Sequence, residues 1–183
     1  MNKNTHKTHF IGLNWKKIMN YSLLSKRYIV RKMNTNDVPL ILSLCSYNEI
    51  YYRYYPPFPT EESIIHDLNA LPTNKTKDDK YYLGYFDKES LVAVIDLIMF
   101  YPNVDTAFIG FFMCDINKQN QGIGSYIISE LCSYLKEIGI KSIRLAFVKD
   151  NPQASHFWFK NDFHEYKQAE PDGISLVIVE RKL

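Results

Sequence analysis

The pattern of apolar and polar positions divides the chain into short helical and strand-like segments. Residues 28–31 form a β-branched and aromatic run, which predicts a first strand. A helix is expected to begin near Asn36, which can cap its first turn, and Asp37, which suits the positive end of a helix. Residues 51–59 contain three prolines and predict an irregular aromatic loop. Thr60 is the expected cap of a second helix.

From residue 81 onward the periodicity becomes strand-like and then helical again. Three short apolar segments separated by polar turns predict an antiparallel meander over residues 81–86, 91–100 and 107–113. Apolar residues then recur every three or four positions from Ile123 to Ile138, with Gly139 placed as a C-terminal cap. The last expected elements are a strand at 142–148, a short helix at 152–161 and a strand at 174–179. This order predicts an α/β (α+β) domain with one sheet.

Composition and charge indicate one globular domain with a basic N-terminal segment. The 183 residues are 46% apolar and 23% charged, which excludes disordered, collagen-like and coiled-coil chains. The net charge of +2 conceals a division, because residues 1–36 contain eight bases and no acid, whereas the 20 acids all lie in residues 37–183. We therefore expect a flexible basic extension over residues 1–27 and an acidic domain over residues 28–183.

Candidate targeting, membrane and metal signals are weak. The apolar run at residues 10–13 is too short for a secretory signal, and the run at 91–100 is shorter than the roughly 18 residues of a membrane span. Cys45, Cys114 and Cys132 are scattered without C-x-x-C spacing, so they predict neither a disulfide framework nor a zinc site. We expect a cytoplasmic protein with no metal site and no membrane partner.

The junction between the third strand of the meander and the long helix carries the most informative motif. Gly122 and Gly124 lie where the helix begins. A helix start leaves about four backbone N–H groups unpaired and carries about half a positive charge, so it can bind an anion. Two glycines there indicate a use for the missing side chains, either an anion site or close packing. The segment lacks the Gly-Lys-Ser/Thr of a P-loop and the third glycine of a dinucleotide-binding motif.

The remaining pattern, Gln119-x-x-Gly122-x-Gly124, resembles the acyl-CoA pyrophosphate loop of the GNAT N-acetyltransferase superfamily. Downstream, Asn151-x-x-Ala154 and a closing Phe163 are similar to the second motif of that family. The predicted order of elements over residues 28–183 also matches. The resemblance implies the GNAT acyl-CoA N-acyltransferase fold, with a mixed, mostly antiparallel sheet flanked by helices.

The resemblance also implies how acetyl-CoA, the co-substrate, would bind. Backbone N–H groups of the loop would hold the pyrophosphate, and the strand before it would pair with the pantetheine arm like an added strand. Gly110 within that strand is a candidate β-bulge. The residues implied to bind acetyl-CoA are Phe112, Met113, Cys114, Gln119, Asn120, Gln121, Gly122, Ile123, Gly124, Ser125, Asn151 and Phe157.

Acetyl transfer in the family is direct, with a backbone N–H, here near Met113 or Cys114, supporting the oxyanion. Where many members have a tyrosine that protonates the leaving thiolate, this chain has Trp158, whose indole is not a usable acid. Asp162 likewise replaces a frequent glycine. Three explanations stay open: the thiolate leaves unprotonated, another group such as Tyr126 or Tyr134 is the acid, or the protein binds acyl-CoA without catalysis.

Two further sets of residues are candidates for the acceptor side. Asp96 is the charge in an otherwise apolar run, so it is a candidate base or amine anchor, with a structural ion pair as the alternative. The aromatic segment at residues 51–58 corresponds to the acceptor pocket of the family and could hold a cationic amine by cation–π contact, with a loop that covers the core as the alternative. Its candidate substrate residues are Tyr51, Tyr52, Arg53, Tyr54 and Tyr55.

These observations predict an N-acetyltransferase that transfers an acetyl group from acetyl-CoA to a primary amine in a ternary complex. The acceptor is expected to be a small molecule or peptide, and the acidic domain favours a cationic amine. We expect no nucleic-acid partner and either a monomer or a homodimer. The alternatives are a non-catalytic acyl-CoA sensor or interaction module and, third, a nucleic-acid binder that uses the basic extension.

Overall fold

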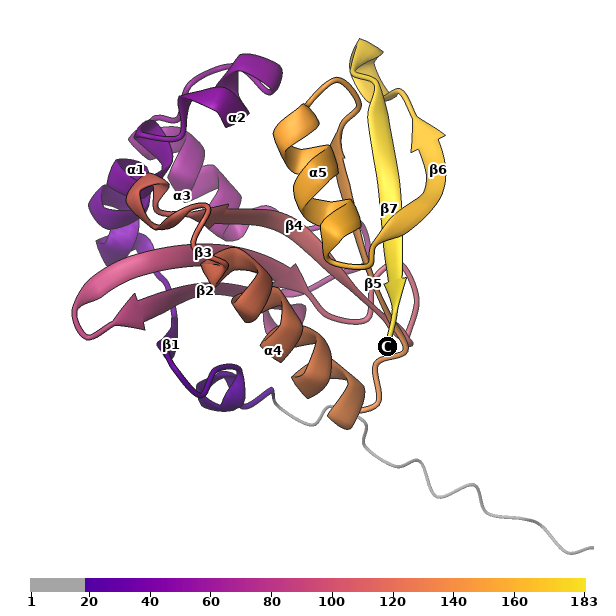
Figure 1. The fold of residues 1–183 in the computed structure, drawn as a ribbon, viewed down its shortest axis with the longest axis horizontal. Helices are drawn as coiled ribbons and strands as arrows, with labels where there is room; N and C mark the ends of the chain where they lie inside the picture. Colours follow the sequence, from indigo (N-terminus) through magenta and orange to yellow (C-terminus); the bar gives the residue numbers. More distant parts are fainter. Residues whose placement is uncertain (1–18) are drawn as a thin grey trace, which may run out of the picture.

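The computed structural model describes residues 19–183, which form a seven-stranded sheet with strand order β1-β2-β3-β4-β5-β7-β6 (Figure 1). The β4–β5 pair is parallel and the other neighbouring pairs are antiparallel. The strands are β1 (Ile29–Lys32), β2 (Lys80–Asp87), β3 (Ser90–Ile98), β4 (Thr106–Cys114), β5 (Ser142–Val148), β6 (His164–Ala169) and β7 (Leu176–Lys182). The predicted mixed, mostly antiparallel sheet is confirmed.

Helices cover both faces of this sheet (Figure 1). They are α1 (Val38–Ser46), α2 (Glu49–Tyr54), α3 (Glu61–Asn69), α4 (Ile123–Glu137) and α5 (Pro152–Lys160). On one face, buried residues of α4 such as Ile127 and Leu131 pack in one core with Ile95 of β3. On the other face, Ile41 of α1 and Ile64 of α3 pack in a second core. Alternate residues of β3 and β4 therefore face two separate helical layers.

The predicted meander is confirmed, and it contains a bulge at Gly110. Asp96 of β3 pairs with Phe111, but the next residue, Leu97, pairs with Ile109, so Gly110 has no partner on β3. Beyond this bulge β4 also loses its other neighbour, because its pairing with β5 extends only over residues 106–109. The two parallel strands therefore diverge, and residues 110–114 keep a free edge toward β5.

Local signals at the helix starts are borne out in part. Thr60 caps α3, because its Oγ1 accepts a hydrogen bond from the Ser63 N–H at 3.2 Å. The expected cap at Asn36 is wrong, since Asn34 caps the 3-10 turn before α1 and receives the Asn36 N–H at 2.9 Å. Asp37 pairs with the Arg31 guanidinium at 2.7 Å instead of bonding to the first turn of α1.

Two elements differ from the sequence prediction. Residues 51–54, expected in an irregular loop, are the last turn of α2, because the prolines that disrupt helices begin only at Pro56. Strand β6 was not predicted. It forms an edge of the sheet, and five of its six side chains are exposed, so it lacks the alternation of buried apolar residues that identifies a strand.

The segment before β1 belongs to the packed domain from residue 19 onward. Met19 and Leu24 are buried in the same core as α4. The Glu130 carboxylate on α4 accepts hydrogen bonds from the Ser25 hydroxyl at 2.6 Å and the Lys26 N–H at 3.0 Å. The expected boundary near residue 28 is therefore too late, because two isolated apolar residues gave no periodic signal. Residues 1–18, the rest of the expected extension, lie outside the described part of the chain.

None of the helices in residues 19–183 has the length and apolar character needed to cross a membrane.

Candidate functional site

The divergence of β4 and β5 opens a cavity of about 520 Å³. On one side it is lined by Asn48, Tyr51 and Tyr55, which come from the start and end of α2. On the other side it is lined by residues of α5, including Phe157 and Trp158. Figure 1 shows α2 and α5 on either side of the diverging ends of β4 and β5. The cavity thus lies between elements that the sequence places about 100 residues apart.

The free edge of β4 supplies the main-chain groups of this cavity. The Asp115 N–H donates to the Val92 carbonyl at 2.9 Å. Because bonded pairs alternate along an antiparallel ladder, the main chain of Met113 also points toward β3, whereas that of Phe112 and Cys114 points away from it, toward the divergence. An extended ligand could therefore pair with the N–H and carbonyl of Phe112 and with the N–H of Cys114, as an added strand does.

The start of α4 presents its amides at the same cavity. Gly122 is the N-cap with φ of 78°, and no side chain caps the helix. Within residues 19–183, no hydrogen bond uses the N–H groups of residues 121–125, and the first intrahelical bond runs from the Tyr126 N–H to the Gly122 carbonyl at 2.9 Å. These unpaired donors and the positive end of the helix dipole make this turn suitable for an anion.

The two glycines of this turn serve different purposes. A Cβ on Gly122 would meet no atom within 4 Å, so Gly122 is needed for its positive φ and leaves the amides open to a ligand. A Cβ on Gly124 would lie 3.0 Å from Cε2 of Phe157 and 3.4 Å from Sγ of Cys114, so Gly124 is needed for packing. The close-packing explanation therefore holds for Gly124, and the open space at Gly122 is compatible with an anion site.

A network of amide side chains connects the elements around the cavity. Asn48, which is 5% exposed, donates to the Cys114 carbonyl at 3.2 Å and to the Leu44 carbonyl at 2.9 Å. The Gln119 amide donates to Asn48 Oδ1 at 2.6 Å and to the same Cys114 carbonyl at 3.3 Å, and its Oε1 accepts from Gln153 at 3.2 Å. The network joins the start of α2, the end of β4, the loop before α4 and α5. Sequence reasoning missed Asn48.

The α5 residues combine a capping role with an aromatic wall. Asn151 is buried, and its Oδ1 accepts the Ala154 N–H at 3.0 Å, so it caps α5. Phe157 stacks on Phe112 with ring centroids 5.7 Å apart, and Trp158 contacts both rings. No hydrogen bond within the described residues uses the Trp158 indole N–H, which leaves it as a donor at the cavity wall.

The comparison with protein families adds the deciding observation. The acetyltransferase (GNAT) family model matches residues 44–163, which run from the last turn of α1 to just beyond α5 and include the whole loop before α4. The chain belongs to the acetyltransferase (GNAT) family. Members of this family use an acyl-CoA and an amine acceptor. The resemblance predicted from the two motifs is therefore confirmed.

Solved structures of GNAT proteins share the fold at low sequence identity. An acetyltransferase from Thermus thermophilus is similar with a TM-score of 0.70 and 18% identity, covering 85% of this chain and 97% of that chain. The PaiA N-acetyltransferase from Thermoplasma acidophilum, solved in complex with coenzyme A, gives 0.62 and 20%, covering 85% and 99%. The ribosomal-protein-S18-alanine N-acetyltransferase from Escherichia coli gives 0.60 and 16%, covering 85% and 93%. No curated protein matches the chain by sequence.

In this GNAT domain, Asp96 lies in a buried ion pair beside the cavity and does not line it. Its Oδ2 is 2.7 Å from Lys80 Nζ, and the two side chains are 13% and 4% exposed. Burial raises the pKa of Asp96 to about 6, although Lys80 acts in the opposite direction. A Cβ on Gly110 would lie 2.9 Å from Oδ2, so the bulge leaves room for the carboxylate. This geometry favours the structural alternative, with a lysine as the partner.

The two tyrosines considered as acids bond to groups outside the cavity. The Tyr126 hydroxyl donates to Glu130 at 2.8 Å, and this bond raises the pKa of Tyr126. The Tyr134 hydroxyl accepts the Asn20 N–H at 2.8 Å. Neither lines the cavity. Burial also raises the pKa of the Cys114 thiol to about 12, so this cavity residue is a thiol at neutral pH.

Of the other candidates, the structure brings some to the cavity and places others elsewhere. Tyr51 and Tyr55 line it, whereas Tyr52 is buried and stacks on Phe58. Arg53 is exposed and lies 3.5 Å from Glu49.

The cavity is lined by ten of the twelve residues implied to bind acetyl-CoA, namely Phe112, Met113, Cys114, Gln119, Asn120, Gly122, Gly124, Ser125, Asn151 and Phe157. The two that do not line it are Ile123, which is buried in the core, and Gln121, which bonds to the Asn117 carbonyl. Tyr54 also lies outside the lining.

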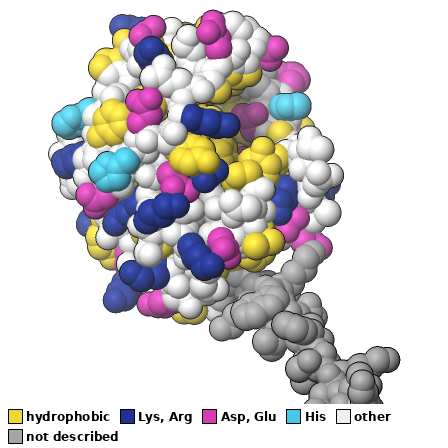
Figure 2. Space-filling model, turned by 90° about the vertical axis from the view of Figure 1, so that its right-hand side faces the viewer, with side chains coloured by type: hydrophobic (Ala, Val, Ile, Leu, Met, Phe, Trp, Pro, Cys, Tyr) yellow, Lys and Arg dark blue, Asp and Glu magenta, His cyan; other side chains and the backbone are white. Residues whose placement is uncertain are grey.

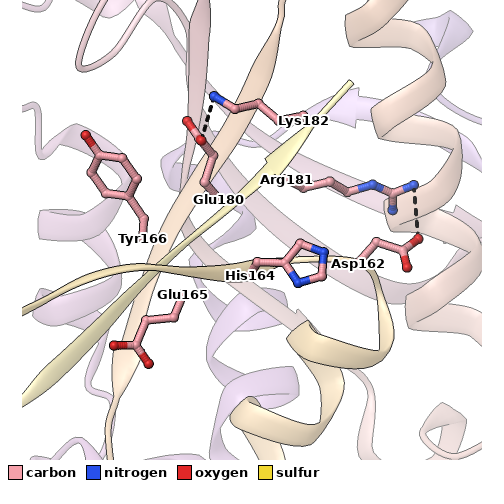
Figure 3. A pocket seen from close by; sticks show the side chains of 7 residues that line it. All are labelled: Asp162, His164, Glu165, Tyr166, Glu180, Arg181 and Lys182. Atoms are coloured by element: carbon pink, nitrogen blue, oxygen red, sulfur yellow. Dashed lines mark ion pairs between the residues drawn. The ribbon is translucent and has the colours of Figure 1, made fainter.

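A second hollow lies at the β6–β7 edge, away from this cavity. Figure 3 shows its side chains, in which Lys182 pairs with Glu180 and Arg181 pairs with Asp162. On the side of the molecule shown in Figure 2, basic and acidic side chains are interspersed. The charges of this hollow are therefore largely neutralised by one another, and it offers no concentrated charge to a ligand.

Proposed function

We propose that the protein transfers an acetyl group from acetyl-CoA to a primary amine by direct attack in a ternary complex. The observation that carries this proposal is the placement of the unpaired amides of α4 beside the free main chain of β4 in one cavity. The amides suit the pyrophosphate, and the open space at Gly122 lets an oxyanion approach them. The Cys114 N–H and the Phe112 carbonyl suit the amide groups of the pantetheine arm.

The remaining lining residues fit the same ligand. Ser125 adds a hydroxyl in the first turn of α4. Phe157 and Phe112 form an apolar wall along the path from that turn toward α2. Asn151 uses its Oδ1 to cap α5, which leaves its amide nitrogen for a carbonyl of the arm. We therefore assign the acyl-CoA to the α4–α5 side of the cavity and the acceptor to the α2 side.

The chemical step needs few protein groups. The neutral amine attacks the thioester carbonyl carbon, the C–S bond breaks, CoA leaves as the thiolate, and the proton lost by the amine passes to water. The Phe112 N–H, which points away from β3 and lies farther along β4 from the α4 amides than Cys114 does, is the assigned donor to the developing oxyanion. Because Tyr126 and Tyr134 bond elsewhere, we propose that the thiolate leaves without protonation by a tyrosine.

Two measurements test this function in turn. Calorimetric titration and thermal melting with acetyl-CoA test binding, and saturation at about 100 times the Kd should stabilise the protein by about 2.7 kcal/mol. A thiol-release assay with a panel of primary amines then tests transfer. Absence of binding would refute the proposal outright. Binding without thiol release from any amine would instead support the acyl-CoA sensor.

A further inference from the structure

We infer that the acceptor is a small primary amine carried on an aromatic or aliphatic apolar group, with no second positive charge. This inference rests on the proposed function and concerns the α2 side of the same cavity. It narrows the sequence-based expectation of a cationic amine to an amine with a single positive charge.

The first observation is the aromatic character of the α2 side. This side is lined by Tyr51 of α2, by Tyr55, which is the C-cap of α2, and by Phe111 of β4. The Tyr51 ring lies 5.6 Å from that of Phe111 in a T-shaped contact and 6.1 Å from that of Tyr55. Such a wall contributes mainly by burying apolar area of its ligand.

The second observation is the absence of acidic groups from the cavity. Among the described residues that line it, none is aspartate or glutamate, and Lys160 is the one lysine or arginine. Asp96 is paired with Lys80 and lies behind Gly110. A polyamine or aminoglycoside would bring several positive charges into a site with no carboxylate to compensate for their lost hydration. The aromatic rings could hold one ammonium group, but not several.

The third observation is size. The whole cavity measures about 520 Å³ and has to hold both the acyl arm and the acceptor. Ligand pockets of about 300 to 1,000 Å³ typically enclose one drug-sized molecule. Because the acyl arm takes up part of this volume, the α2 side favours a small acceptor group. This size favours a small-molecule amine over a folded protein substrate.

The test compares acceptors at saturating acetyl-CoA by thiol release. We expect kcat/KM for 2-phenylethylamine to exceed that for spermidine by at least about tenfold. Tyr55→Glu places a carboxylate in the aromatic wall and should lower this ratio by at least about tenfold. Tyr47→Glu is the matched control, because Tyr47 is 70% exposed and outside the cavity lining, and it should leave the ratio unchanged. Calorimetry of both variants with acetyl-CoA checks that they are folded and bind the co-substrate.

Each result bears on a different claim. Spermidine, or a hexapeptide with a free N-terminus, as the best acceptor would overturn this inference and leave the proposed function standing. An unchanged ratio in a Tyr55→Glu variant that still binds acetyl-CoA would also overturn it, because the α2 wall would not select the acceptor. Acetyl-CoA binding without thiol release from any amine would overturn both this inference and the proposed function.

Discussion

Three glycines at the two ends of α4 allow backbone strain to be separated from ligand contact. Gly122 and Gly139 have φ of 78° and 95°, and a Cβ on either would meet no atom within 4 Å. They differ in location, because Gly122 precedes α4 at the cavity whereas Gly139 follows its other end. Gly124 contrasts with both, since its Cβ would press on the Phe157 ring at 3.0 Å without any unusual φ. Alanine at each position therefore perturbs a different property.

The expected magnitudes follow from these geometries. A left-handed alanine costs about 1–2 kcal/mol, partly offset by about 0.4–1 kcal/mol from the stiffer unfolded chain. Gly122→Ala and Gly139→Ala should each lower the free energy of unfolding by roughly 1 kcal/mol, which lowers Tm by about 2–4 °C in a domain of this size. In Gly124→Ala, crowding of Phe157 is opposed by the roughly 1 kcal/mol by which alanine favours a helix over glycine. Its Tm should therefore change little.

Acetyl-CoA affinity should follow a different order. Gly122→Ala puts a methyl group where an oxyanion approaches the amides, and Gly124→Ala displaces the Phe157 ring that lines the cavity. Both should weaken acetyl-CoA binding by about tenfold, or about 1.4 kcal/mol. Gly139→Ala should bind acetyl-CoA as the unaltered protein does. Thermal melting and calorimetry on the three variants measure both quantities.

The three variants can refute the reasoning in two ways. Normal acetyl-CoA affinity in Gly122→Ala would show that the α4 amides are not the pyrophosphate site. A loss of affinity in Gly139→Ala equal to that in Gly122→Ala would show that both losses come from destabilisation, because Gly139 does not line the cavity.

Three other predictions follow from polar contacts of side chains. Lys80→Met leaves Asp96 without its ion-pair partner and should cost about 3–5 kcal/mol at pH 8. The loss of unfolding free energy should be smaller at pH 5. Burial already raises the pKa of Asp96 to about 6, and without Lys80 it rises further, so the carboxyl takes up a proton. Equal losses in urea unfolding at both pH values would contradict this. Asn48→Ala leaves buried amide partners unsatisfied and should cost about 1–3 kcal/mol, whereas the exposed Asn69→Ala should cost less than about 0.5 kcal/mol in the same urea experiment. Tyr126→Phe should keep kcat within about twofold, and a tenfold or larger fall would restore Tyr126 as the acid.

The fold could be predicted wherever a local pattern coincides with burial. The period of Ile127, Leu131 and Leu135 identifies α4, and all three side chains are fully buried. Strand β6 could not be predicted in this way, because its edge position leaves most of its side chains in solvent. The turn of α2 at residues 51–54 was also missed, because the prolines that follow it at Pro56 act on the chain after the helix has ended.

The candidate site could be predicted where its function depends on short-range motifs. The loop at residues 119–124 and the cap at Asn151 are each part of a short sequence motif, and Asn151 and four residues of the loop line the cavity. Asn48 acts through partners 66 and 71 positions away, at Cys114 and Gln119, so no local pattern marks it. The lysine that pairs with Asp96 is likewise known only from strand register, which brings β2 alongside β3.

The cavity depends on where the pairing of β4 with β5 stops, and the pattern of apolar residues does not indicate that position. Residues of β4 on either side of Gly110 are similarly apolar, yet those before it pair with β5 and those after it do not. The bulge at Gly110 removes one residue from the ladder with β3, and the carboxylate of Asp96 occupies the space that a side chain at this position would fill. Because a bulge bends and twists its strand, we expect Gly110→Ala to disturb both the Asp96–Lys80 pair and the divergence of β4 from β5. The free edge that can receive an acyl-CoA is thus produced by a local irregularity of the sheet, and the glycine that permits it contributes no group to the chemistry.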